Sequence, residues 1–156
     1  MENIFIDLET YSDIDLQKCG VYKYAESPNF EILLFGYSID GAAVKVIDLA
    51  MGETILPEIL TALSDENITK WAFNSQFERV CLSAYLKKNY PQYFNSYSAD
   101  DDAVGNYISP KGWKCSLVWA AYMGLPLSLK AVGEALKLTD RKMDEGKTLI
   151  KYFSVP

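Results

Sequence analysis

The amino-acid sequence predicts an α/β domain with a mixed β-sheet that is flanked by helices. Strand-like segments follow one another through residues 2–50, and the last two are joined by Asp40-Gly41, a pair typical of tight hairpin turns. A further short strand runs directly into a helix, the connection that favours parallel strand pairs. The 156 residues are 49% hydrophobic, enough for one domain that buries about two-thirds of its unfolded surface.

The first half of the predicted sheet is an antiparallel meander. Residues 2–8 (ENIFIDL) predict the first strand, and residues 9–30 hold Ser, Asp and Gly around LQKCGVYKYA, which favours a short helix or a turn. Residues 30–40 (FEILLFGYSID) are apolar enough for a central strand. Residues 42–50 (AAVKVIDLA) alternate between apolar and polar side chains and predict its hairpin partner.

The second half predicts helices around one more strand. Residues 54–66 (TILPEILTALSDE) place their apolar side chains on one helical face. Residues 68–73 (ITKWAF) predict a short strand, and residues 75–88 (SQFERVCLSAYLKK) predict the helix that follows it. Residues 89–112 are rich in Tyr, Asn, Pro, Ser, Asp and Gly and predict a loop.

Helical patterns fill the remainder of the chain, at about 114–123, 128–137 and 141–153. Ser128 and Asp140 precede the last two as candidate N-cap residues. No repeat, linker or low-complexity segment divides the sequence, so we expect a single domain.

Composition excludes several classes of function. The sequence has no histidine, which removes Ser-His-Asp and Cys-His catalysis and histidine zinc sites. A net charge of −6 argues against a simple electrostatic coat on nucleic acid or on an anionic membrane. There is no signal-peptide pattern, no apolar run of the roughly 18 residues that a membrane span needs, and no CxxC pair. We therefore expect no membrane partner, reduced thiols and a cytoplasmic location, with carboxylates as the main catalytic resource.

The first candidate site is Asp7-x-Glu9, at the end of the first predicted strand. Strand side chains alternate between faces, so both carboxylates share one face of the sheet. Two neighbouring anions perturb each other's protonation unless a cation lies between them, and oxygen-ligated Mg²⁺ or Mn²⁺ suits such a pair. The motif is short, and a solvated polar strand end is the alternative.

The second candidate site is the segment 72–80 (AFNSQFERV), where a strand passes into a helix. Asn74 lies at the junction and Glu78 lies in the first turn of the helix. An N-cap role for Asn74 and a favourable interaction of Glu78 with the helix dipole are the structural alternatives. As a functional site, Glu78 would lie opposite the first two carboxylates, with an amide and the Phe77 ring nearby for a nucleotide.

These segments together resemble a known family. FIDLET followed by FNSQFE is similar to the first two motifs of the DEDD 3′→5′ exonucleases, whose fold is ribonuclease H-like. The closer likeness is to the N-terminal, proofreading-type domain of phage-type family A DNA polymerases. It extends over nearly the whole chain, through IDLETYSDIDLQKCGVYKYAESPNFEILLFGYSIDG, AFNSQFERVCL, WKCSLVWAAYMGLPLSLKAVGEALKL and DEGKTLIKYFSVP. The resemblance implies a ribonuclease H-like mixed sheet, a three-stranded antiparallel meander plus parallel strands, flanked by helices.

The resemblance also implies a two-metal catalytic site. Asp7, Glu9 and Glu78 would be its catalytic carboxylates and would bind the metals, Mg²⁺ or Mn²⁺. Most relatives have aspartate where this chain has Glu78, which keeps the charge and adds one methylene to the side chain. Two such cations activate a water molecule and stabilise the departing 3′ oxygen of a phosphodiester.

The implied substrate is a single-stranded 3′ end of DNA. Asn74 and Phe77 would lie beside it, as their counterparts do in the family. We expect Leu8, Thr10 and Tyr11 to pack against the terminal nucleotide, as side chains do in single-strand binders.

The third motif of the family, Tyr-x-x-x-Asp, is absent from its expected place. Tyr11-x-x-x-Asp15 and Tyr97-x-x-x-Asp101 fit the pattern, but both precede GKTLIKYF, the segment after which the motif belongs. We therefore expect residues 1–156 to be a single exonuclease-type domain, truncated before its last carboxylate and weakly active or inactive by itself. The polymerase domain of the same full-length chain would be its partner.

Two alternatives remain open. One is a catalytically silent domain of the same fold that binds DNA or braces the polymerase domain. The other is a free-standing nuclease domain that takes its last carboxylate from a partner. The resemblance implies a phage- or prophage-encoded protein of the bacterial cell. Lys114-Cys115-Ser116 falls where many relatives have Asp-Thr, and we expect it to start a helix.

Overall fold

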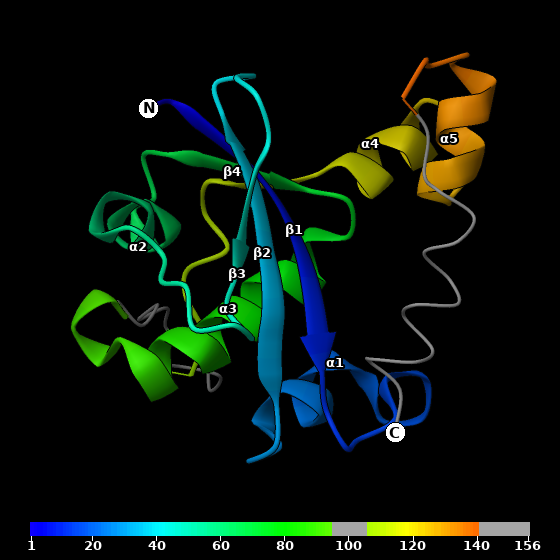
Figure 1. Cartoon of the computed structure of the whole chain (residues 1–156). Coiled ribbons are helices and arrows are strands. Elements are labelled where there is room, and N and C mark those ends of the chain that lie inside the picture. Colours follow the sequence, from blue (N-terminus) through cyan, green and yellow to red (C-terminus); the bar gives the residue numbers. More distant parts are fainter. Residues whose placement is uncertain (95–105, 141–156) are drawn as a thin grey trace.

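The first strand of the sequence lies at the centre of the sheet in the computed structural model, which describes residues 1–94 and 106–140 (Figure 1). Within these residues the sheet has five strands in the order β3-β2-β1-β4-β5. The strands are β1 (Asn3–Tyr11), β2 (Glu31–Ile39), β3 (Lys45–Asp48), β4 (Thr69–Ala72) and β5 (Trp113–Cys115). The helices are α1 (Leu16–Glu26), α2 (Pro57–Ser64), α3 (Ser75–Asn89), α4 (Ser116–Tyr122) and α5 (Leu129–Ala135), with a 3₁₀ helix, η1, at Pro91–Tyr93.

The antiparallel meander is confirmed. β1 pairs with β2 and β2 pairs with β3, both antiparallel, whereas β4 pairs in parallel with β1 and β5. The β2–β3 turn has positive φ at Asp40 (48°) and Gly41 (79°), as expected for a tight hairpin of this sequence. Ala42 N donates to Ile39 O at 2.9 Å and closes the turn. The sheet is therefore mixed, as predicted.

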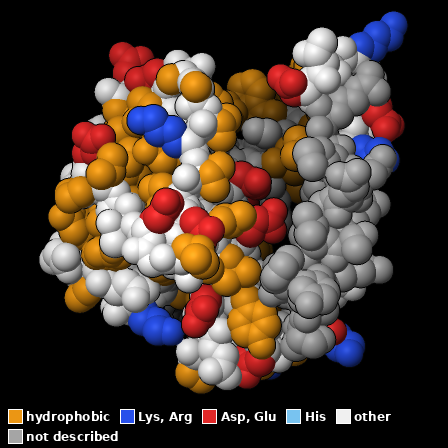
Figure 2. Space-filling view, viewed as in Figure 1, with side chains coloured by type: hydrophobic (Ala, Val, Ile, Leu, Met, Phe, Trp, Pro, Cys, Tyr) orange, Lys and Arg blue, Asp and Glu red, His pale blue; other side chains and the backbone are white. Residues whose placement is uncertain are grey.

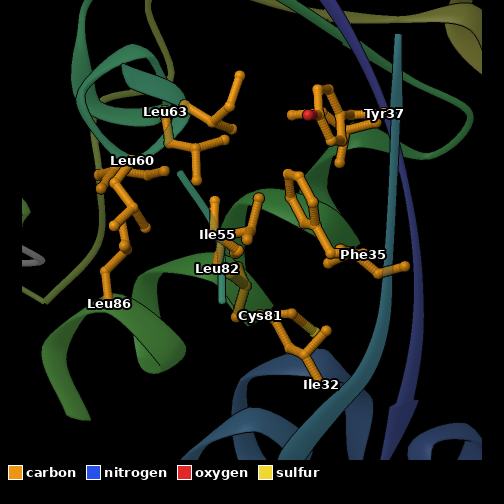
Figure 3. Close-up of a cluster of buried hydrophobic side chains, with 14 of the residues drawn as sticks. Ile32, Phe35, Tyr37, Ile55, Leu60, Leu63, Cys81, Leu82 and Leu86 are labelled. Carbon is orange, nitrogen blue, oxygen red and sulfur yellow. The ribbon is translucent and has the colours of Figure 1, made fainter. Parts of the chain in front are cut away.

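Alternation along the strands gives the sheet two different faces. Ile4, Ile6 and Leu8 of β1 are buried against α3, whose Cys81, Leu82 and Leu86 also lie in the core. Figure 3 shows these α3 side chains with Ile32 and Phe35 of β2 and with the apolar side of α2. On the opposite face, Phe5 is 42% exposed and Val46 is 59% exposed. We call this second side the exposed face.

The exposed face is partly covered near β4. Phe5 and Trp71 lie in register on β1 and β4, and their rings stack with centroids 6.3 Å apart. Trp119 of α4 contacts Trp71 edge-on, with centroids 5.8 Å apart. The part of the exposed face over β1 and β2 carries the acidic side chains described below.

The helix predictions differ from the structure mainly at residues 113–115. These residues form β5, where we predicted a loop ending at 112 and a helix beginning at about 114. Their pairing with β4, from Lys70↔Trp113 to Ala72↔Cys115, is a contact distant in sequence that no local periodicity reveals. α4 then starts at Ser116, the last residue of the Lys114-Cys115-Ser116 segment where we expected a helix to begin.

The remaining elements agree with the predictions in type and differ in length. Residues 9–30 contain α1, which is interrupted by non-helical backbone at Gly20. The helix predicted at 54–66 is the shorter α2, and α5 begins after Ser128, whose side chain accepts from Ala131 N at 3.2 Å as an N-cap. The helix predicted at 141–153 lies outside the described residues. Within the described part of the chain, no helix combines the length and the apolar character that crossing a membrane requires.

A buried lysine stabilises the connection between α2 and β4, at the side of the sheet where β4 pairs with β5. Lys70 is almost fully buried, and its Nζ donates to Asp65 O beyond the end of α2. Burial lowers the pKa of Lys70 to about 8, although the charges of Asp65 and Glu66 oppose that shift. Its backbone N donates to Gly112 O at 2.7 Å, so the segment before β5 lies directly over this lysine.

Gly112 is expected to tolerate no side chain. Its φ is +77°, and a Cβ would lie 2.8 Å from Glu66 O and 2.9 Å from Ile68 O, both backbone atoms. We expect Gly112→Ala to lower the free energy of unfolding by about 2–3 kcal/mol, measured by urea denaturation. Gly124→Ala is the matched control, because Gly124 has φ +73° and no described heavy atom within 4 Å of such a Cβ. Equal losses in the two variants would contradict the role assigned to the close backbone approach.

Candidate active site

Asp7 and Glu9 lie on the exposed face of the central strand. In the β1–β2 register Asp7 is opposite Gly36 and Glu9 is opposite Leu34, so the two carboxylates share one face as the alternation predicted. Acidic side chains gather among apolar ones over the strands at the centre of Figure 2. The sheet thus presents two carboxylates, two residues apart, toward solvent.

The strand is irregular next to Glu9. Glu9 pairs with Leu34 whereas Thr10 pairs with Ile32, so Leu33 is an extra residue on β2. Its carbonyl oxygen accepts from Leu49 N at 3.0 Å and Ala50 N at 3.1 Å instead. Bulges of this kind bend a strand and re-aim the neighbouring side chains, and they are frequent beside active sites.

Gly36 leaves space beside Asp7. A Cβ at Gly36 would lie 3.4 Å from Asp7 O and 3.9 Å from Asp7 Cβ, so a larger side chain would lie against Asp7. A glycine in the interior of a strand weakens it and often marks a close approach of another group. The sequence analysis missed Gly36, although a glycine inside FEILLFGYSID was the signal that could have found it.

The junction between β4 and α3 positions Glu78. Asn74 occupies the N-cap position of α3 in a left-handed conformation (φ 86°), and its side chain makes no capping hydrogen bond. The plain N-cap alternative is therefore not what the structure shows for this asparagine. Phe77 N donates to Asn74 O at 2.9 Å, which starts the first turn. Glu78 follows in that turn and is only 4% exposed.

Glu78 is a buried carboxyl group in an unfavourable environment for its charge. Burial raises the pKa of Glu78 to about 8, and the negative charge of Asp7 and the Cys115 thiol act in the same direction. Oε2 of Glu78 is buried and has no hydrogen-bond partner among the described residues. An oxygen of this kind is costly unless it is protonated or meets a cation.

Cys115 is a second group near Glu78 that the sequence analysis did not assign to the site. Its thiol lies where α3 and α4 begin. Burial raises the pKa of this thiol, but hydrogen bonds from backbone N–H groups lower it by more. These N–H groups belong to Ser75, Val118, Asn74 and Leu117. The net shift is downward. No pattern in the sequence shows this proximity, because it arises from the β4–β5 pairing.

The donor chemistry fits a hard divalent cation. A carboxylate oxygen without a partner and the electrostatic repulsion between Glu78 and Asp7 are both relieved by Mg²⁺ or Mn²⁺, which prefer oxygen ligands. Across residues 1–94 and 106–140, however, no three Asp, Glu, Cys or His side chains are placed to hold an ion together. The charges of Asp7 and Glu78 thus influence each other, but the described residues do not form a complete set of metal ligands.

The other predicted site residues divide into buried and accessible groups. Leu8 is 6% exposed and Thr10 is 5% exposed, both on the core side of β1, so neither is available on the surface for direct contact. Tyr11 and Phe77 are partly buried, and Asn74 is exposed.

The two Tyr-x-x-x-Asp matches have different outcomes. Asp15 of the first match is the N-cap of α1, and its carboxylate accepts from Gln17 N at 2.9 Å and Lys18 N at 3.2 Å. Its surroundings are thus those of a structural cap. The second match, Tyr97 and Asp101, lies outside the described residues.

Comparison with known proteins gives one curated relative. The chain is 44% identical over its full 156 residues to the DNA polymerase of Bacillus phage SP02, and it spans 21% of that protein, about a fifth of its length. No protein-family model matches the sequence.

Solved structures share the fold at low sequence identity. NrnC of Brucella melitensis with bound Mg²⁺ has a TM-score of 0.55 at 17% identity, covering 92% of this chain and 57% of that chain. The same protein bound to pGG has a TM-score of 0.56 at 17% identity, covering 92% of this chain and 56% of that chain. RNase D of Trypanosoma brucei in complex with RNA U12 has a TM-score of 0.57 at 16% identity, covering 95% and 43%.

These findings confirm the resemblance that the motifs indicated. The fold is shared with the structures of NrnC and RNase D, and the sequence relationship extends across the whole chain. The chain has a ribonuclease H-like fold and is related along its full length to part of a phage DNA polymerase.

Proposed function

We propose that this chain is the 3′→5′ exonuclease domain of a longer DNA polymerase and hydrolyses phosphodiester bonds at a DNA 3′ end with divalent cations. The observation that carries the proposal is the Glu78 carboxyl group, buried without a partner for Oε2 and electrostatically coupled to Asp7 on the central strand. The 44% identity to a phage DNA polymerase supports the assignment to such a protein.

Each carboxylate has a role set by its position. Asp7 and Glu9 would hold cations at the exposed face, where a phosphodiester can approach, and Glu78 would hold a cation from the α3 side. Bound cations supply Lewis-acid activation of water and charge stabilisation of the leaving 3′ oxygen. Because burial raises the pKa of Glu78 to about 8, a cation bound at this carboxyl group would displace a proton near neutral pH.

Accessible side chains around the carboxylates are proposed to contact the nucleotide. Asn74 offers an amide from the exposed start of α3, and the rings of Tyr11 and Phe77 offer stacking surfaces. The buried Leu8 and Thr10 support these contacts from the core side. NrnC bound to pGG and RNase D bound to RNA U12 show that proteins of this fold bind nucleic acid.

The test is a polarity assay on the full-length protein with single-stranded DNA. With Mg²⁺ or Mn²⁺ we expect a 5′-labelled strand to shorten stepwise from its 3′ end and a 3′ label to leave in the first step, and we expect EDTA to stop both. Loss of the 5′ label first would contradict the polarity. An intact strand with either cation would instead favour the catalytically silent domain.

Gly36→Val gives a specific test of the space beside Asp7. Valine suits a central strand better than glycine, so we expect the free energy of unfolding to stay equal or rise by up to about 1 kcal/mol. Because the new side chain lies beside Asp7, we expect the exonuclease rate to fall by about tenfold, as changes next to metal ligands do. Gly36→Ala is the matched control with a smaller loss. Full activity in the valine variant would show that this space is not used.

A further inference from the structure

Tyr24 lies between the two segments that carry the acidic residues. It belongs to α1, is 4% exposed, and was not among the residues that the sequence singled out. Its side chain reaches Thr10, next to Glu9 in β1, and its ring reaches Phe77, next to Glu78 in α3. These contacts join segments that are far apart in the sequence.

The hydroxyl group of Tyr24 forms a buried hydrogen bond. Tyr24 OH and Thr10 Oγ1 are 2.9 Å apart. A tyrosine phenol is protonated at neutral pH, and burial raises the pKa of Tyr24 further. Removing one of the two hydroxyl groups leaves the other buried without a hydrogen-bond partner, so the loss of either hydroxyl is costly.

The backbone of Tyr24 binds the same strand end. Ser12 Oγ, which is fully buried, donates to Tyr24 O at 2.9 Å and accepts from Ile14 N at 3.2 Å. Side chain and backbone of one residue thus fix the strand just after the bulge at Glu9. β1 ends here, at Tyr11.

The ring of Tyr24 is held between two aromatic side chains. Its centroid is 6.2 Å from that of Phe77, with planes at 41°, and 5.7 Å from that of Phe30, with planes at 70°. Such tilted and edge-on contacts favour one orientation of the ring. A displacement of the Tyr24 ring would therefore also displace Phe77, in the first turn of α3.

We propose that Tyr24 is a positioning residue that fixes the distance between the Asp7–Glu9 segment and the Glu78 turn, through Thr10 on one side and Phe77 on the other. This inference deepens the proposed function and rests on it only for the effect on catalysis. Tyr24 touches neither substrate nor cation in this role. It fixes the positions of the carboxylates before the substrate or a cation binds.

The experiment is a double-mutant cycle in the full-length protein with Tyr24→Phe and Thr10→Val. Each variant keeps the shape and removes one hydroxyl, so both delete the same hydrogen bond. We expect each to lower kcat by about tenfold with KM changed less than about twofold, as loss of a positioning contact does. The double variant should lose no more than either single variant, and Thr10→Ser, which keeps the hydroxyl, should restore kcat. Tyr37→Phe is the matched control, because Tyr37 is equally buried at 4% and its ring packs on Phe35, whereas the ring of Tyr24 packs on Phe77.

Hydrogen exchange separates this inference from the proposed function. Thr10→Val should speed amide exchange in residues 75–79, which are linked to Thr10 through Tyr24 and Phe77, and Tyr37→Phe should not. If the wild-type protein shows no nuclease activity, the proposed function fails, and exchange at residues 75–79 alone decides the coupling. Unchanged kcat together with exchange confined to residues 10–24 would overturn the role of Tyr24.

Discussion

Asp7→Asn is expected to abolish metal-dependent exonuclease activity in the full-length protein. The substitution keeps the size of the side chain and removes the charge that a cation requires. We expect a loss on the order of 10³-fold in kcat, equivalent to about 4 kcal/mol of transition-state stabilisation. Asp7 lies on the exposed face, so we expect the free energy of unfolding to change by no more than about 0.5 kcal/mol.

The control for this loss is a carboxylate of equal charge elsewhere. Glu58 is exposed in the first turn of α2, and Glu58→Gln removes one negative charge at a distance from the site. Activity in Glu58→Gln should match the wild type, and Glu9→Gln should resemble Asp7→Asn. Retention of full activity in an Asp7→Ala, Glu9→Ala double variant would refute the assignment of these carboxylates.

Glu78→Gln is expected to change the pH dependence of stability in metal-free buffer. The folded protein holds this proton with a pKa of about 8, well above the ordinary value of 4.5. Because the folded state binds the proton more tightly, the free energy of unfolding falls as pH rises from about 4.5 to about 8 and is constant above that range. Glutamine keeps the shape and cannot ionise, so this fall should disappear. At pH 8.5 the variant should be the more stable by up to about 4 kcal/mol.

The measurement is urea denaturation of both proteins across pH 5 to 9 with EDTA present. Glu58→Gln again serves as the control and should keep the slope of the wild type. Adding Mn²⁺ should stabilise the wild type at pH 8.5 more than Glu78→Gln, because ligand binding to the folded state adds to its stability. Parallel pH profiles for the wild type and Glu78→Gln would contradict the burial of an uncompensated carboxyl group at this position.

Local sequence patterns predicted the part of the fold that depends on local contacts. Alternation and the Asp40-Gly41 turn gave the meander, because hairpin register follows from turn geometry and from which face is buried. β5 was missed because residues 113–115 become a strand only through pairing with β4. Three residues carry too short a pattern to identify by themselves.

The same distinction applies to the site. Strand alternation was sufficient to place Asp7 and Glu9 on one face, and the strand-to-helix junction was sufficient to place Glu78 in the first turn. The left-handed backbone of Asn74 and the position of Tyr24 between two segments depend on how α1 and α3 pack. Contacts of that kind are not encoded in any single stretch of sequence.

We propose that Asp7, Glu9 and Glu78 bind the cations that catalyse hydrolysis. Mn²⁺ titration of the full-length protein, followed by electron paramagnetic resonance, tests it most directly. We expect the wild type to bind Mn²⁺ at sites that Asp7→Asn weakens by at least about tenfold, as loss of a charged ligand should. Equal numbers of bound ions with equal affinity in the wild type and Asp7→Asn would contradict the claim.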